Sequence, residues 1–168
     1  MSESLQVPFD QAIEDSTPIT PAFLNWERSF VSGPNSPLFE VEHRLSNQNP
    51  DLLITLVKFK PTAEGPPGHV HGGATAALID EVMGVLVWHN HNRCVTEKLS
   101  LQYLRPVPLK EDAVLFTRIY TPDSKEAKKI EIRTTIYNKT KSPCVHAQGL
   151  FHRLSEAQLE VFRKHHQE

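Results

Sequence analysis

Alternating apolar and polar residues dominate the second half of the chain and predict β-strands. In the run 130–138, isoleucine and threonine alternate with charged and polar residues, which is typical of a half-buried antiparallel strand. Short polar segments between several such runs fit hairpin connections. We expect strands over 38–45, 52–59, 95–104, 113–121, 130–138 and 144–153.

The segment 72–88 has a different pattern. It is small or apolar on every side apart from Thr75, Asp80 and Glu81, and a helix that is hydrophobic all round belongs in a core. Its length would be roughly 25 Å, about that of a strand layer. We therefore expect an α+β fold in which one long central helix is wrapped by an antiparallel sheet of about six strands.

Two shorter helices are expected near the ends of the chain. Residues 21–31 carry apolar side chains at helical spacing after Thr20 and Pro21, a pair that suits an N-cap and a first helical position. Residues 155–166 begin with an N-cap candidate, Ser155, and carry a weak apolar stripe.

The length of 168 residues suits one domain with a substantial core. We assign that domain to 21–168, with its core at 38–153. Residues 1–20 show no sustained period and predict an extended N-terminal arm.

Composition and charge exclude several functions. The formal net charge of −2 gives no general surface for nucleic acid, and no stretch approaches the ~20 apolar residues that span a bilayer. The first residues fit neither a signal peptide nor a transit peptide, so a cytoplasmic location is expected. The two cysteines, Cys94 and Cys144, are expected to be free, buried thiols.

The adjacent acids of the central helix are the first candidate site. An isolated buried carboxylate costs several kcal/mol unless it is paired or hydrogen-bonded. At about 100° per residue, Asp80 falls within roughly 20° of Gly73, whereas Glu81 is turned about 80° away. Asp80 therefore shares a face with the helix start, while Glu81 is expected to be structural, paired with a lysine or an arginine.

The start of this helix is the second candidate. Its first backbone N–H groups have no intrahelical partner and carry the positive end of the helix dipole, and glycine lets a ligand oxygen approach them closely. Such donors can form an oxyanion hole. An acid on the same face could attack the carbonyl or activate a water, which is the chemistry of acyl transfer.

Several separated motifs recur in the order of one known family. They are Gly-Pro-Pro-Gly-x-x-His-Gly-Gly at 65–73, Asp80 nine residues after His71, Val95-Thr96, Leu99, and Tyr103-Leu-Arg-Pro-Val-Pro at 103–108. Over about residues 38–153 the chain resembles the PaaI-type branch of the hotdog-fold acyl-CoA thioesterases, within the 4HBT superfamily. The resemblance implies a hotdog fold and hydrolysis of an acyl-CoA thioester without a cofactor. It also implies a homodimer or a dimer of dimers, with active sites between subunits.

The resemblance also assigns roles to residues. It makes Asp80 the acid that attacks the thioester or activates water, and the amide of Gly72 the oxyanion donor. Gly73 would support close approach, and His71 would border and position the thioester. Thr96 would hold the water from the neighbouring subunit's half of the site.

Three further positions complete these expectations. Tyr103 and Arg105 lie near where relatives place CoA, so both are substrate-binding candidates. Where many relatives have Asn or Gln to contact the thioester carbonyl, this chain has Gly65.

Two alternatives stay open. A hotdog hydratase or dehydratase would use an acid/base pair such as His71 and Asp80 on a β-hydroxyacyl chain. A hotdog protein that binds acyl groups or a partner and has lost turnover is the other, and the Gly65 departure is the reason to keep it open. The His-x-His pairs at 69–71 and 89–91 lie at opposite ends of the helix, so no metal site is expected.

Overall fold

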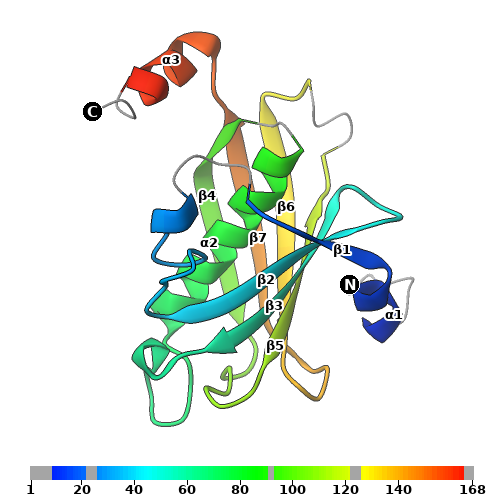
Figure 1. Ribbon diagram of the computed structural model, residues 1–168, viewed down its shortest axis with the longest axis vertical. Coiled ribbons are helices and arrows are strands. Elements are labelled where there is room, and N and C mark those ends of the chain that lie inside the picture. Colours follow the sequence, from blue (N-terminus) through cyan, green and yellow to red (C-terminus); the bar gives the residue numbers. More distant parts are fainter. Residues whose placement is uncertain (1–8, 22–25, 91–92, 122–125, 165–168) are drawn as a thin grey trace.

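One antiparallel sheet curves around one long helix in the computed structural model of this chain, which describes residues 9–21, 26–90, 93–121 and 126–164 (Figure 1). The strands are β1 (Ser16–Ile19), β2 (Phe39–Ser46), β3 (Leu52–Phe59), β4 (Cys94–Tyr103), β5 (Ala113–Ile119), β6 (Lys129–Tyr137) and β7 (Pro143–Arg153). The helices are α1 (Phe9–Glu14), α2 (Gly72–His89) and α3 (Glu156–Lys164), with 3-10 turns η1 (Trp26–Arg28) and η2 (Pro61–Ala63).

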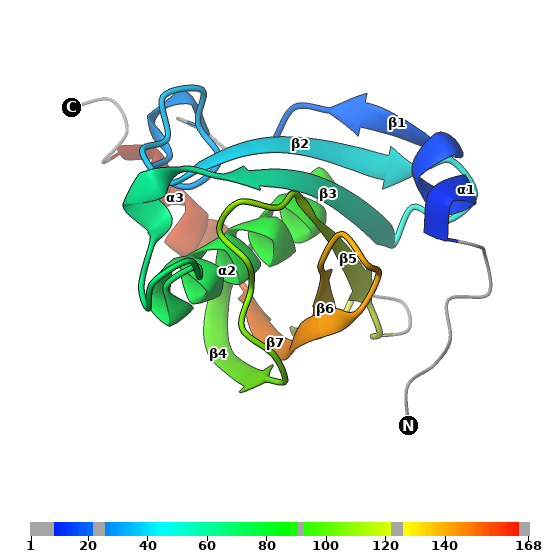
Figure 2. The same ribbon diagram turned by 90° about the horizontal axis from the view of Figure 1, so that it is seen from below.

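The strand order is β1-β2-β3-β5-β6-β7-β4, and every neighbouring pair is antiparallel. Seen from below, the strands from β3 to β4 bend around α2, which lies inside the curve (Figure 2). The expected six strands and the long central helix are confirmed, with ends that differ by one or two residues.

The N-terminal segment departs from the expected arm, because its described part is folded. Strand β1 pairs with β2 from Ser16↔Ser46 to Ile19↔His43 and becomes one edge of the sheet. A strand of four residues is too short to display a period in the sequence. It also contains Pro18, which cannot donate to a ladder and is tolerated in an edge strand.

Helix α1 covers the face of the sheet opposite α2. The ring of Phe9 lies edge-on to Phe116 and Tyr137, with ring centroids 4.9 and 5.4 Å apart. Asp10 of the same helix forms an ion pair of 2.6 Å with Lys141. These contacts tie residues that were expected to be an arm onto strands β5 and β6.

The helix expected at 21–31 is wrong in its described part, since only η1 is helical there and residues 22–25 lie outside the described residues. The hydroxyl of Ser29 accepts hydrogen bonds from the N–H groups of Val31 and Ser32. Such local bonds compete with a helix and end it. The C-terminal helix is confirmed over Glu156–Lys164, with Ser155 accepting the N–H of Gln158 at 3.3 Å.

Close packing between α2 and the sheet fixes the position of the helix. Leu78, Ile79 and Met83 are fully buried against the sheet. A Cβ atom on Gly149 of β7 would lie 2.6 Å from the Met83 sulfur, so the bare backbone of that strand lets α2 approach closely. Both cysteines are free and buried, as expected, and burial raises the pKa of Cys94 to about 11.

One buried histidine lies in the sheet. His43 of β2 is only 3 % exposed, and its Nδ1 lies 3.0 Å from the hydroxyl of Thr55. Its Nε2 has no hydrogen-bond partner. Burial lowers the pKa of His43 to about 4, because the charged imidazolium would lose its hydration.

Candidate active site

The loop before α2 brings Gly65 against His71. Glu64 and Val70 form an antiparallel bridge, and the N–H of Gly65 donates to the carbonyl of His69 at 2.9 Å. A Cβ atom on Gly65 would lie 2.7 Å from the Cα of His71, which is closer than real side chains come. The Asn or Gln of many relatives therefore has no room here unless the loop moves.

The first turn of α2 is capped by a histidine. His71 occupies the N-cap position, and its Nδ1 accepts the N–H of Gly73 at 2.9 Å. A nitrogen that accepts carries no proton, so the neutral ring carries its proton on Nε2 and presents that nitrogen as a donor. The N–H of Gly72 has no acceptor among the described residues, which leaves it free for a ligand.

Tyr103 at the end of β4 contacts the same turn. Its hydroxyl donates a hydrogen bond of 2.8 Å to the carbonyl of Gly72. The peptide between Gly72 and Gly73 is thus held at both ends, by Tyr103 at its oxygen and by His71 at its nitrogen. Tyr103 is 53 % exposed, so a ligand could still reach its ring.

Asp80 is held by Thr96 of the same chain. The Thr96 hydroxyl donates a hydrogen bond of 2.7 Å to Oδ1 of Asp80, and Oδ2 has no partner among the described residues. The resemblance implied that Thr96 acts from the neighbouring subunit's half of the site. In the structure, Thr96 and Asp80 form one unit within a single chain.

An irregularity in β4 allows both the hydrogen bond from Thr96 to Asp80 and the hydrogen bond from Tyr103 to Gly72. Thr96 and Tyr103 are seven positions apart, so a regular strand would point them to opposite faces. The β4–β7 register shifts between Thr96 and Lys98. Such a bulge inserts one extra residue and reverses the alternation, so both side chains face α2.

Glu81 has other partners than expected. Its Oε1 accepts hydrogen bonds from the hydroxyls of Ser29, at 2.6 Å, and of Ser32. No lysine or arginine pairs with it among the described residues. Glu81 is structural, because it ties the turn after η1 to the middle of α2.

A pocket of about 320 Å³ lies at the start of α2. It is lined by Pro66, His69, Val70, Gly72, Thr75, Tyr103, Leu104, Arg105, Pro106 and Val107. Three of the predicted residues, Gly72, Tyr103 and Arg105, thus meet in one pocket. Asp80 lies farther along α2 and does not line it.

Two pocket residues have their own fixed geometry. Arg105 donates from Nη1 to the carbonyl of Pro143 at 2.7 Å, which steadies the guanidinium at the pocket. His69, which sequence reasoning set aside with the possible metal ligands, has Nδ1 3.0 Å from the carbonyl of Pro67. A carbonyl only accepts, so Nδ1 of His69 carries the proton, and its neutral ring is the opposite tautomer to that of His71. Its place within the 65–73 motif was the signal in the sequence.

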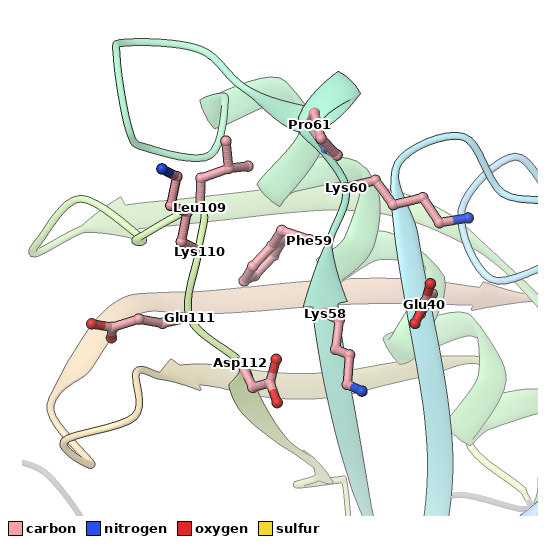
Figure 3. Close-up of a pocket in the computed structure, with 9 residues that line it drawn as sticks. All are labelled: Glu40, Lys58, Phe59, Lys60, Pro61, Leu109, Lys110, Glu111 and Asp112. Carbon is pink, nitrogen blue, oxygen red and sulfur yellow. The ribbon is translucent and has the colours of Figure 1, made fainter.

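A second hollow, of about 350 Å³, has a different character (Figure 3). The Phe59 ring lies at its centre, and three lysines and three acids surround it, namely Lys58, Lys60, Lys110, Glu40, Glu111 and Asp112. The amine of Lys60 already donates to the carbonyl of Ser36 at 2.7 Å. With balanced charges and none of the predicted site residues, this hollow is not the candidate active site.

Two general features concern metals and membranes. Within residues 9–21, 26–90, 93–121 and 126–164, no three His, Cys, Asp or Glu side chains gather as metal ligands would, and His91 lies outside these ranges. None of the helices in this part of the chain combines the length and apolar character that crossing a membrane requires. The cytoplasmic location stays a prediction.

A long helix inside a curved antiparallel sheet defines this chain as a hotdog-fold protein, and solved structures agree. A thioesterase superfamily protein with 32 % sequence identity aligns with a TM-score of 0.65 over 73 % of this chain and 62 % of that one. A hypothetical thioesterase protein from Streptococcus pneumoniae, solved with coenzyme A, has 16 % identity and a TM-score of 0.62, covering 69 % and 87 %. The profile of the 4HBT Thioesterase superfamily matches residues 67–141 of this chain.

Two curated relatives are named acyl-coenzyme A thioesterase THEM4. The Xenopus laevis protein is 35 % identical over 57 residues, which cover 34 % of this chain and 26 % of that protein. The Rattus norvegicus protein is 31 % identical over 86 residues, which cover 51 % of this chain and 35 % of that protein. The chain thus matches only about a quarter to a third of the length of these relatives.

Proposed function

We propose that this protein hydrolyses acyl-CoA thioesters to a free acid and CoA. The observation that carries the proposal is the Asp80 carboxylate, held by Thr96, on the same helix as the unpaired N–H of Gly72. An activated water and an oxyanion donor are the two requirements of thioester hydrolysis. The names of the curated relatives support the same substrate class.

In the proposed reaction, the free Oδ2 of Asp80 accepts a proton from a water, whose oxygen attacks the thioester carbonyl carbon. The N–H of Gly72 stabilises the resulting oxyanion, and Nε2–H of His71 is a second donor beside it. When the carbonyl re-forms, the carbon–sulfur bond breaks and the thiolate takes the proton from Asp80. A thiolate is a good leaving group, so neither a nucleophilic triad nor a metal is required.

The two halves of the site are far apart within one chain. Asp80 lies eight residues after Gly72, which is about 12 Å along the helix axis. A carbonyl makes contacts of about 3 Å with its donor and with an attacking water. We therefore propose that Gly72 and His71 of one subunit act with Asp80 and Thr96 of a second copy.

The free edge of the sheet supports this homodimer. β4 is the edge strand opposite β1 and has ten residues, most of them exposed, including Val95 at 37 %. A long, unprotected edge strand is a template for pairing with another chain. A two-fold axis there would place the two α2 helices antiparallel, so that the start of each helix lies beside Asp80 of the other. A dimer of dimers, which the resemblance also implies, would keep this composite site.

The pocket at the start of α2 suits the CoA arm. Its walls are largely apolar, and the exposed guanidinium of Arg105 supplies a cation for a phosphate. The Tyr103 ring offers a flat surface beside Gly72. We propose that the pantetheine and phosphates of CoA approach the thioester site through this pocket.

The capping bond of His71 weighs against the hydratase alternative. A general base needs a free lone pair, but Nδ1 of His71 accepts the Gly73 N–H and Nε2 carries the proton. His71 is therefore suited to donate a hydrogen bond, and not to abstract a proton from a β-hydroxyacyl chain.

Thiol release from a panel of acyl-CoA substrates of different chain length, alkyl and aryl, tests the proposal. We expect release by the wild type and a loss of about 100-fold or more in kcat for Asp80→Asn. Asp112→Asn, an exposed acid outside the site, is the matched control. Binding without release would identify an acyl-binding protein, and loss of enoyl absorbance without release would identify a hydratase.

A further inference from the structure

We propose that Tyr103 is a positioning residue that fixes the tautomer and orientation of His71 through the peptide between Gly72 and Gly73. This inference rests on the proposed function, in which His71 donates a hydrogen bond to the thioester. The resemblance implied only that Tyr103 lies near CoA. Its hydroxyl, however, is bonded to the protein backbone.

The hydrogen bonds form a directed chain. The Tyr103 hydroxyl donates to the carbonyl of Gly72 at 2.8 Å, and the N–H at the other end of that peptide donates to Nδ1 of His71 at 2.9 Å. Hydrogen bonds in series polarise one another, so the first strengthens the second. The chain ends at Nε2–H of His71, which becomes the outward donor.

The close approach of Gly65 and Gly73 restricts the position of the His71 ring. A Cβ atom on Gly73 would lie 3.0 Å from Nδ1 of His71, and one on Gly65 would lie 3.0 Å from its Cβ and 3.1 Å from its Cδ2. Both neighbours are glycine, so the ring fits between them. Packing limits where the ring can lie, and the bond from Gly73 N–H, which the Tyr103 hydrogen bond strengthens, sets the ring orientation and which nitrogen carries the proton.

The bulge in β4 is what brings Tyr103 to this peptide. Without the register shift between Thr96 and Lys98, Thr96 and Tyr103 would face opposite sides of the sheet. One irregularity therefore serves both parts of the site. It directs Thr96 toward Asp80 and Tyr103 toward the start of α2.

Tyr103→Phe removes the hydroxyl and keeps the ring, so it tests the inference directly. The first readout is the ¹⁵N NMR spectrum of the His71 imidazole at neutral pH. We expect one tautomer, protonated at Nε2, in the wild type, and a mixture in Tyr103→Phe. Tyr137→Phe, whose ring lies on the opposite face of the sheet, is the matched control and should keep the wild-type spectrum.

The second readout is kinetic. Tyr103→Phe should lower kcat about five- to tenfold, the effect of one hydrogen bond, with KM within about twofold. In a His71→Ala background the same substitution should cost nothing further, because Tyr103 acts through His71. Additive losses, or wild-type His71 signals in Tyr103→Phe, would overturn the inference. Absence of thiol release by the wild type would instead refute the proposed function, and the NMR result would still decide the role of Tyr103.

Discussion

Thr96 donates a 2.7 Å hydrogen bond to the carboxylate of Asp80, across from β4 to the middle of α2. This bond occupies Oδ1 and leaves Oδ2 to hold a water, so it orients the acid that the proposed reaction uses. We expect Thr96→Val, which has nearly the same shape, to lower kcat about tenfold with little change in thermal stability. Thr96→Ser keeps the hydroxyl and should retain most of the activity. Full turnover by Thr96→Val would show that the bond does not contribute to catalysis.

Introducing at position 65 the Asn that many relatives have should lower both the stability and the activity of the protein. Gly65→Asn introduces a Cβ atom 2.7 Å from the Cα of His71, so the loop must shift and displace the N-cap of α2. We expect a loss of about 1–3 kcal/mol in the free energy of unfolding, together with reduced kcat. Pro67→Ala, at an exposed position of the same loop that does not line the pocket, is the control. A gain in thiol release by Gly65→Asn would contradict this expectation.

Gly149 sets the distance between α2 and the sheet. A methyl group there would lie 2.6 Å from the Met83 sulfur and 2.9 Å from the Phe151 ring. Gly149→Ala should therefore lower the free energy of unfolding by about 1–3 kcal/mol, measured by urea denaturation. In a Met83→Ala background, Gly149→Ala should lower the free energy of unfolding by less than it does in the wild type, since the clash partner is removed. An additive loss in the double variant would argue against this contact.

Gly84 tests the proposed homodimer. It lies within about 40° of Asp80 around α2, and a Cβ atom there would meet nothing within 4 Å in the single chain. In the proposed dimer this face meets the second α2, so Gly84→Arg should give a monomer by sedimentation and remove thiol release. Asp112→Arg adds the same side chain on an exposed loop and should leave both unchanged. An active Gly84→Arg monomer would rule out the composite site.

His43 should make the fold sensitive to acid. Its pKa is about 4 in the folded chain, because of burial, against an ordinary value of 6.5. Between these pH values the unfolded chain binds a proton that the folded chain does not, so stability is full above about pH 6.5 and falls toward pH 4. The fall attributable to His43 is on the order of 3 kcal/mol.

His43→Gln, which can still bond Thr55 but does not titrate, should flatten the stability profile in this window. Urea denaturation at several pH values measures the difference between the two proteins. Equal slopes in the variant and the wild type would mean that other groups cause the acid sensitivity.

Local patterns in the sequence determined much of this protein. Residue alternation located the six long strands, and the unbroken apolar character of 72–88 located α2 in the core. Burial on one face of a strand leaves an alternation in the sequence, and burial on all faces of a helix leaves a continuous apolar run. The α3 cap at Ser155 was predicted for the same local reason. The rotation between Gly73 and Asp80 follows from helix geometry alone, so their shared face was also accessible.

Contacts between distant segments were decided only by the tertiary structure. The strand β1 carried too short a pattern, and Glu81 took serine partners from a turn about fifty residues away in sequence. The β4 bulge, which turns Thr96 and Tyr103 to one face, depends on pairing with β7. Bulges, close glycine approaches and hydroxyl partners arise where separate elements meet, and no single segment encodes them. The sequence therefore predicted Asp80 and the start of α2 as site candidates, and the packing of β4 against α2 determined how each is held.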